Sequence, residues 1–305
     1  MNNKRSVIVR LAIILIIPLI LIKSLSLLQK PSYNPLSLFN FNAFRSVKNT
    51  KMTNSPIIEK SVTHRTNLSS NYGSVEKELS KPQINYGIPV LCYHDVNPTP
   101  GNPLLLDPNK FKKQMQYLKD NGYSTLSMDQ LYSFLKEDGP LPEKPVVITF
   151  DDGYVGNYTY AFPVLKEFGF NATIFIISDC IDLGPYMTSG QIKEMTSYGI
   201  DIESHTTNHC DLSKMDLKAQ TDNLKSSKEK LEDLINKPVD YLAYPYGKYN
   251  MYTRKAAAAA GYKMGFSLHG ALTDKKDNIY NLDRFYISNN YSIDYFIKIL
   301  STKSR

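Results

Sequence analysis

Two adjacent aspartates stand at a point of the sequence where they could do acid–base or metal chemistry. Asp151 and Asp152 follow directly after the apolar run 146–150 and precede Gly153. Neighbouring carboxylates in one site repel and raise one pKa, unless a cation lets one hold the metal while the other acts as a base. The same pattern is also typical of a plain strand followed by a turn. The aspartate pair therefore needs a partner elsewhere in the chain.

Two histidines at ligand spacing supply such a partner. His205 and His209 follow the apolar run 200–203, and the chain has only five histidines. If a helix begins there, the two imidazoles lie on one face and can close on a single metal ion. Two histidines and one carboxylate leave coordination positions open, which is typical of catalytic sites. The zincin pattern His-Glu-x-x-His is absent from the sequence, which excludes that class.

A third motif, Tyr244-Pro245-Tyr246-Gly247, ends another apolar run. Proline fixes the turn and glycine permits close backbone approach, which suits a backbone N–H that stabilises a developing oxyanion. In isolation the motif indicates only a turn.

The elements that must position these motifs alternate along the chain from residue 86 onward. Runs typical of strands are followed by patterns typical of helices, which predicts a parallel sheet. About seven such repeats favour closure into a distorted (β/α) barrel, with an open doubly wound sheet as the competing fold. Barrels place catalysis at the carboxyl ends of strands, where all three motifs stand. The predicted strands are 88–93, 146–150, 172–177, 200–203, 241–244, 263–267 and 284–287, and the predicted helices are 108–121, 161–168, 189–198, 216–235 and 251–260.

The charge of the chain is concentrated at its beginning. Residues 1–86 hold 12 basic and 3 acidic residues, whereas residues 87–305 hold 24 and 26. The formal net charge of +7 therefore does not describe the predicted barrel, and we expect no nucleic-acid partner.

The first 28 residues predict a membrane anchor. The apolar run 11–22 follows Lys4, Arg5 and Arg10, and with snorkelling of the flanking charges the segment can span a bilayer. The basic flank places the N-terminus in the cytoplasm. A cleaved signal peptide is the alternative. In either case we expect the rest of the chain to be exported.

We expect residues 29–86, rich in Ser, Asn, Lys and Pro, to be a disordered basic linker. Residues 87–305 then form the catalytic domain on the extracellular side, as a single-pass membrane protein and a monomer.

The three motifs together resemble those of a known family. Segments 149–153, 204–209 and 244–247, in this order and each after a predicted strand, are similar to the polysaccharide deacetylase family with the NodB homology domain, carbohydrate esterase family 4. The likeness covers roughly residues 87–290. Segment 90–95, with Tyr93-His94, further resembles the poly-N-acetylglucosamine deacetylase branch. The resemblance implies a distorted (β/α) barrel and a divalent metal, commonly zinc, with cobalt, nickel or iron as alternatives.

The resemblance also implies roles for the metal-site motifs. Carried over by position, Asp152, His205 and His209 would hold the metal, and Asp151 would be the general base that activates the attacking water. The N–H of Tyr246, placed by Pro245, would stabilise the tetrahedral oxyanion.

The general acid that protonates the leaving amine has two candidates. His94 ends the first predicted strand and matches the Tyr-His of the related branch, whereas His269 follows the strand 263–267. Histidine suits this task near neutral pH, and we favour His94.

Three departures from the family pattern carry further predictions. Many members have an arginine that orients the base where Ala243 and Tyr244 stand here, so we predict that Arg284 replaces it. Because the chain has no Trp, Leu268 or Tyr246 would line the acetyl methyl. Glu203 directly precedes the histidine motif, and we expect it at the surface.

The resemblance implies hydrolysis of N-acetyl groups from N-acetylglucosamine in a surface polymer, either poly-N-acetylglucosamine or peptidoglycan. An O-acetyl xylan esterase would use the same residues. A catalytically silent carbohydrate-binding protein on the same fold is a further alternative, but the complete set of aspartates and histidines argues against it.

Overall fold

The computed structural model describes residues 87–303. The predicted anchor 1–28 and linker 29–86 lie outside these residues, so both stay predictions. Across residues 87–303, no helix has the length and apolar character needed to cross a bilayer.

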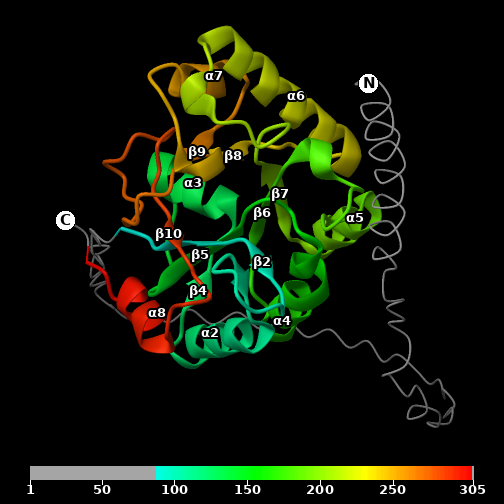
Figure 1. Ribbon diagram of the computed structural model, residues 1–305. Coiled ribbons are helices and arrows are strands. Elements are labelled where there is room, and N and C mark those ends of the chain that lie inside the picture. The colour runs from blue at the N-terminus through cyan, green and yellow to red at the C-terminus, as the bar shows by residue number, and fades with distance from the viewer. Residues whose placement is uncertain (1–86, 304–305) are drawn as a thin grey trace, which may run out of the picture. The chain divides into compact units, whose positions relative to one another are not determined.

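A parallel sheet carries the fold (Figure 1), with its main path in the order β10-β1-β5-β6-β7-β8-β9 and the short β4 (Ser124–Thr125) paired to the start of β5. All seven predicted strands are present, with ends that differ by at most two residues. A separate pair, β2 (Asp95–Val96) and β3 (Leu105–Leu106), was not predicted. The strands of the main path are β1 (Val90–Tyr93), β5 (Pro145–Phe150), β6 (Thr173–Ile176), β7 (Asp201–Ser204), β8 (Tyr241–Ala243), β9 (Met264–Phe266) and β10 (Phe285–Tyr286).

The two edges of this sheet are brought together by the segment 282–286. Leu282 forms a parallel bridge with Phe266 of β9, and three residues later β10 pairs with β1 through Leu91 and Phe285. An open doubly wound sheet would keep its edge strands apart. The curl is therefore consistent with the predicted distorted (β/α) barrel.

Alternate residues along each strand face two different apolar layers. Leu91 and Ile148 pack outward with the helices, whereas Val90 and Val147 pack inward with Met128. Because parallel strands are buried on both faces, their sequences are almost continuously apolar. Figure 1 shows the outer helices arranged around the sheet, and these are α2 (Pro108–Asp120), α4 (Phe162–Phe168), α5 (Ser189–Tyr198), α6 (Leu217–Ile235), α7 (Thr253–Ala259) and α8 (Ile293–Leu300).

Helix α3 (Met128–Glu137) lies on the inner side and was not predicted. Its residues Met128, Leu131 and Leu135 join the inner apolar layer, and its first N–H donates to Asp201 at 3.1 Å. Since Asp201 begins β7, α3 covers the amino-terminal end of the strands and leaves the opposite end for the site.

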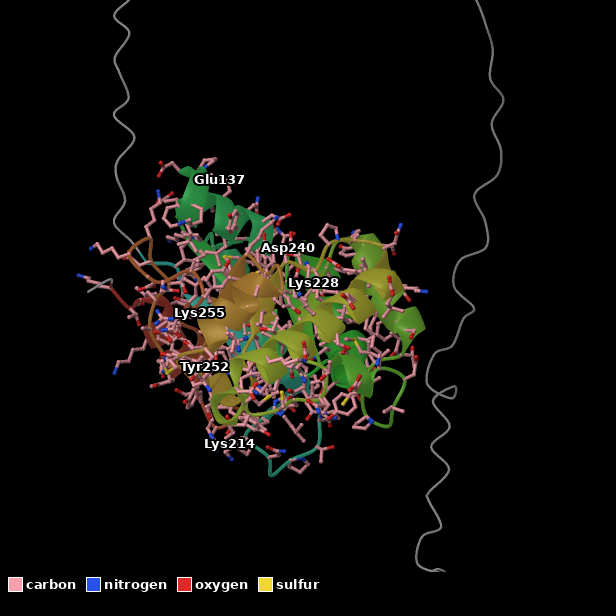
Figure 2. All side chains as sticks on the ribbon, turned by 90° about the horizontal axis from the view of Figure 1, so that it is seen from above. Glu137, Lys214, Lys228, Asp240, Tyr252 and Lys255 are labelled. Atoms are coloured by element: carbon pink, nitrogen blue, oxygen red, sulfur yellow. The ribbon has the colours of Figure 1, made fainter. Side chains whose placement is uncertain are left out.

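An ion-pair network holds the helices to the amino-terminal end of β8 and β9. Lys228 of α6, labelled with Asp240 in Figure 2, donates to the Val239 carbonyl at 2.6 Å and lies 3.2 Å from an Asp240 carboxylate oxygen. Lys263, just before β9, lies 2.7 Å from the other Asp240 oxygen. This network stands at the end of the sheet opposite the three motifs.

Candidate active site

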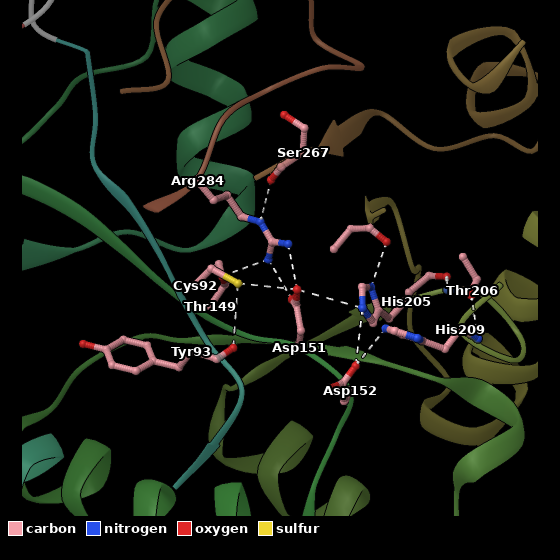
Figure 3. Close-up of polar contacts among 12 residues, drawn as sticks. Cys92, Tyr93, Thr149, Asp151, Asp152, His205, Thr206, His209, Ser267 and Arg284 are labelled. Atoms are coloured by element: carbon pink, nitrogen blue, oxygen red, sulfur yellow. Dashed lines mark hydrogen bonds and ion pairs between the residues drawn. The ribbon is translucent and has the colours of Figure 1, made fainter. Parts of the chain in front are cut away.

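The sequence motifs meet at the carboxyl ends of the strands because the backbone pairing continues one residue beyond each strand. The N–H of Asp151 donates to the Tyr93 carbonyl at 2.9 Å, and the N–H of His205 donates to the Ile176 carbonyl at 2.8 Å. Side chains two residues apart share a face, so Asp151 follows Thr149 onto the inner side. Figure 3 shows these residues converging on one centre.

Asp152, His205 and His209 form a compact group of three ligand atoms. Asp152 Oδ1 lies 3.5 Å from His205 Nε2 and 3.3 Å from His209 Nε2. One donor atom of each residue lies within 4.8 Å of the other two. Asp152 adopts a left-handed backbone with φ of 74°, which turns its side chain away from the line of the strand. The predicted three-residue metal set is thus brought together.

The chemistry of this group fits a divalent cation. Asp152 Oδ1 is buried and has no hydrogen-bond partner within residues 87–303. A buried carboxylate oxygen without a partner is costly unless a cation compensates it. Burial raises the pKa of Asp152 to about 7, the charge of Asp151 adds to this shift, and a hydrogen bond from Tyr154 opposes it. A cation at Oδ1 would favour the ionised carboxylate.

The tautomer of His205 follows from its other neighbour. Its Nδ1 lies 2.9 Å from the Ala243 carbonyl oxygen, which can only accept, so Nδ1 carries the proton. The lone pair of Nε2 then faces Asp152, the arrangement typical of metal-ligating histidines. Burial lowers the pKa of His205 to about 4, which keeps the ring neutral and able to ligate.

The condition of a helix at the histidine motif is not met. Residues 205–209 form a turn in which Thr206 and His209 have φ of 70° and 56°. The N–H of His209 donates to Thr206 Oγ1 at 3.1 Å, which tightens this turn. The turn replaces the helical face and brings the two ring centroids to 5.0 Å.

Arg284 holds Asp151 with two hydrogen bonds. Its Nη1 and Nη2 donate to Oδ1 and Oδ2 at 2.7 Å each, and both side chains are buried. Burial alone would raise the pKa of Asp151, but the guanidinium outweighs it and holds this pKa below its usual range. Asp151 therefore stays ionised beside the three-residue group, with Oδ2 at 3.9 Å from His205 Nε2. The contact predicted for Arg284 is present, although its catalytic role stays a prediction.

Two side chains beside this pair were missed from the sequence. Arg284 Nη1 also donates to Thr149 Oγ1 at 3.2 Å, and Cys92 Sγ lies 3.4 Å from Asp151 Oδ2. Both stand two residues before a predicted site residue, Thr149 before Asp151 and Cys92 before His94. The two-residue period of a strand would have placed them on the inner face. All three cysteines of the chain are free thiols.

The two candidate general acids lie in different surroundings. His94 is largely buried, its Nδ1 has no hydrogen-bond partner within residues 87–303, and burial lowers its pKa while the charge of Asp151 raises it. His269 instead pairs through Nδ1 with Asp283 Oδ1 at 2.9 Å. None of the contacts within the described residues joins His269 to Asp151 or to the three-residue group. The pairing of Tyr93 with Phe150 places His94 next to Asp151, whereas His269 pairs with Asp283, and the general acid stays a prediction.

The Tyr-Pro-Tyr-Gly motif borders the same centre. Tyr246 has φ of 59° and is 60% exposed, and its ring lies 4.5 Å from that of His209. Its N–H forms no hydrogen bond within residues 87–303, so it is available to a ligand. Pro245 is buried, and a Cβ on Gly247 would come within 2.7 Å of Leu268 Cβ, so Leu268 packs closely on this turn.

The expected surface position of Glu203 is wrong. Glu203 is 5% exposed, lies on β7 two residues before His205 and accepts a hydrogen bond from the Tyr241 N–H at 2.8 Å. Burial raises its pKa well above the usual value. It belongs to the wall beneath the histidines because the strand alternation points it inward.

Comparisons with known proteins identify relatives of this chain. The family model described as polysaccharide deacetylase matches residues 138–265. The Bacillus subtilis protein YxkH, named as a polysaccharide deacetylase, is 38% identical over 66% of this chain and 71% of its own length. A poly-beta-1,6-N-acetyl-D-glucosamine N-deacetylase of Staphylococcus epidermidis is 35% identical over 59% of this chain and 67% of its own.

A solved structure is similar as well. The Streptococcus pyogenes deacetylase PplD, determined in complex with acetate, superposes with a TM-score of 0.67 and 31% identity. The match covers 71% of this chain and 99% of that one. The similarity thus extends over the sheet and helices described above.

Proposed function

Since this chain belongs to the polysaccharide deacetylase family, we propose that it is a metal-dependent hydrolase that removes N-acetyl groups from N-acetylglucosamine units of a surface polysaccharide. One observation carries the proposal: an aspartate held ionised by Arg284 stands directly beside the Asp152, His205 and His209 group. A base next to a cation site is the arrangement that hydrolysis of an unreactive amide requires.

The metal would be held by Asp152 Oδ1, His205 Nε2 and His209 Nε2. When bound, a zinc, cobalt, nickel or iron ion would supply Lewis-acid activation of water and of the acetyl carbonyl. Three protein ligands leave positions open for these groups.

Asp151 accepts the proton of the attacking water at a carboxylate oxygen. Arg284 donates to both oxygens, and Oδ2, which also lies 3.4 Å from Cys92 Sγ, is the oxygen on the side of His205 Nε2. Because the guanidinium keeps the pKa of Asp151 low, the base is ready at neutral pH, and the same bidentate contact fixes its orientation.

The other two steps use the neighbouring groups. The N–H of Tyr246 donates to the carbonyl oxygen as negative charge develops there. His94 passes a proton to the nitrogen as the C–N bond breaks, so its ring must be protonated at this step, which the charge of Asp151 favours and burial opposes. The products are acetate and a free amine on the sugar.

The relatives support an amide substrate. The Staphylococcus epidermidis protein is named for N-deacetylation of poly-beta-1,6-N-acetyl-D-glucosamine, and PplD was determined with acetate, the product of any deacetylation. Peptidoglycan is the second polymer that the same chemistry would serve, and O-acetyl xylan is the ester alternative.

The decisive experiment measures acetate release from N-acetylglucosamine oligomers, peptidoglycan and acetylated xylan, each with and without a chelator. We expect release from an N-acetylated polymer that stops with chelator and returns with zinc. Release from xylan alone would contradict the proposed substrate, and chelator-resistant release would contradict the metal.

We also propose that residues 1–28 anchor the chain, with the catalytic domain on the extracellular side. The support is the apolar run 11–22 after three basic residues. Fractionation of cells expressing the full chain, followed by protease treatment of intact cells, tests it. Recovery of the intact chain in the soluble fraction would contradict the anchor.

A further inference from the structure

Two loops begin at the catalytic centre, one at a proposed metal ligand and one at the proposed oxyanion donor. We call residues 210–215, which follow His209, the histidine segment, and residues 247–252, which follow Tyr246, the tyrosine segment. Neither segment contains a strand, and no main-chain hydrogen bond joins the one to the other. Side chains must therefore set the distance between them.

The side-chain amide of Asn250 joins the tyrosine segment to the histidine segment, and we call this contact the Asn250 bridge. Its Nδ2 donates to three main-chain carbonyl oxygens of the histidine segment, those of Leu212 at 3.2 Å, Ser213 at 3.1 Å and Met215 at 2.9 Å. An amide nitrogen carries two protons, so two of these oxygens share one of them. One side chain thus holds the whole turn of the histidine segment.

Gln220 of helix α6 orients the Asn250 amide. Its side chain is completely buried, and its Nε2 donates to Asn250 Oδ1 and to the Met215 carbonyl oxygen at 2.9 Å each. Because a carbonyl oxygen only accepts, the Gln220 atom that faces Met215 is the nitrogen. Asn250 must then present its oxygen to Gln220, which leaves Nδ2 for the three carbonyls of the bridge.

Asn250 also has a local role just before helix α7. Its Oδ1 accepts from the Tyr252 N–H at 2.9 Å, and its own N–H donates to Thr253 Oγ1 at 2.9 Å. Turns of this kind before a helix suit asparagine and aspartate alike, because both offer a side-chain oxygen. The Asn250 bridge instead needs an NH₂ group, which aspartate lacks. A substitution can therefore separate the two roles.

The placement of His209 and Tyr246 depends on their surroundings. Both have a left-handed backbone, with φ of 56° and 59°, which a residue other than glycine keeps only where neighbouring contacts hold it. Their rings lie 4.5 Å apart. A second link between the two segments, the ion pair of Lys248 with Asp211 at 3.5 Å, is partly exposed and contributes little. The Asn250 bridge is thus the stronger of the two links.

We propose that Asn250 is a positioning residue for the deacetylation, because its bridge sets where the Tyr246 N–H stands relative to the metal ligand His209. The inference rests on the proposed function and deepens it, since it names one residue on which the metal and the oxyanion donor both depend. None of the contacts within the described residues joins Asn250 directly to His209 or to Tyr246. Its effect passes through the two segments, and a displacement of about 1 Å can lower a rate about 10²-fold.

Asn250→Asp tests the bridge and keeps the turn before α7. The aspartate retains the oxygen that accepts from Tyr252, but it places a second oxygen against three carbonyl oxygens, so the histidine segment should move away. On an N-acetylglucosamine oligomer we expect kcat to fall about 10- to 100-fold, with KM within about twofold of the wild type. A wild-type kcat would show that Asn250 serves only the start of α7 and would overturn the inference.

Asn250→Ala is the second variant, because it removes the bridge without adding a charge and keeps the test open if the aspartate variant does not fold. We expect kcat to fall about 10-fold or more. A wild-type kcat in this variant would equally overturn the inference.

Asn171→Asp is the matched control. Asn171 stands just before β6, and its Nδ2 donates to the Thr125 carbonyl oxygen at 3.0 Å, so the same substitution breaks a bridge of the same kind at the opposite end of the sheet. Thermal unfolding should show a loss of stability in both variants, whereas kcat should fall only in Asn250→Asp. An equal fall of kcat in both would trace the effect to stability and contradict the positioning role.

Measurements without turnover separate this inference from the proposed function. Zinc affinity, from competition with a chromogenic chelator, and hydrogen exchange of peptides from the two segments need no substrate. In Asn250→Asp we expect zinc binding to weaken about 10-fold, as for other residues that orient metal ligands, and exchange to become faster in both segments. These changes, in a protein whose wild type releases no acetate, would keep the bridge and contradict the deacetylase. Acetate release by the wild type, with zinc affinity and exchange unchanged in Asn250→Asp, would contradict the bridge alone.

Discussion

Ionised aspartates sit between basic side chains at both ends of the sheet, but in different surroundings. At the carboxyl end, Asp151 meets a guanidinium that is completely buried, whereas at the amino end Asp240 lies between Lys228 and Lys263, of which Lys263 is 46% exposed. Water screens the second network and not the first. The same type of contact therefore orients a base at one end and only ties elements together at the other.

The largest loss should follow removal of a metal ligand at the carboxyl end. In His205→Ala only Asp152 and His209 remain to hold the metal. Because metal affinity depends on the number of ligands, we expect the protein to lose stoichiometric metal and its acetate release to fall to background. Metal analysis of the purified protein checks this, with His269→Ala as the histidine control that should retain the ion. Full metal content in His205→Ala would contradict the assigned site.

Asp151→Asn should separate metal binding from proton transfer. We expect kcat to fall by about 10² to 10⁴, the range of general-base catalysis, while bound metal stays near the wild-type amount. Steady-state kinetics and metal analysis on the same preparation give both readouts. If the metal were lost together with activity, Asp151 would be a ligand rather than the base.

Arg284→Ala should change both the stability of the protein and the pH dependence of its activity. The substitution leaves Asp151 as an uncompensated buried charge. In comparable buried pairs this lowers the free energy of unfolding by about 3 to 5 kcal/mol. Chemical denaturation measures this loss, and Arg284→Lys should recover part of it.

The pH dependence of kcat/KM in Arg284→Ala should shift in a defined direction. Arg284 lowers the pKa of Asp151 in the folded protein, so its contribution to stability is present above the unfolded pKa and is lost as the pH falls toward the folded one. Without the guanidinium the pKa of Asp151 rises, and the acidic limb of kcat/KM should move to higher pH. An unchanged limb would show that Arg284 does not set the ionisation of the base.

Lys263→Ala should show the smallest effect. Because the lysine is half exposed, we expect less than about 1 kcal/mol of lost stability and no change in acetate release. Thermal unfolding and the acetate assay check both. A loss of stability as large as that of Arg284→Ala would erase the difference between the two ends of the sheet.

The strand pattern was predictable because parallel strands bury both faces and read as apolar runs. The same reasoning missed α3, although Ser127 and Gln130 form a capping box at its start. It also missed β2, β3 and β4, which are only two residues long and carry almost no periodic signal. Short elements are held by what they pack against, not by their own pattern.

The sequence by itself determined which residue types could do the chemistry, because the motifs at residues 151–152 and 205–209 are local and follow apolar strands. Only the tertiary structure decided which distant side chains meet them. Arg284 lies 133 residues from Asp151 in the chain, yet the curl of the sheet brings the two side chains into bidentate contact. It likewise placed His94 next to Asp151, because strand register, not spacing along the chain, sets which strand ends are neighbours.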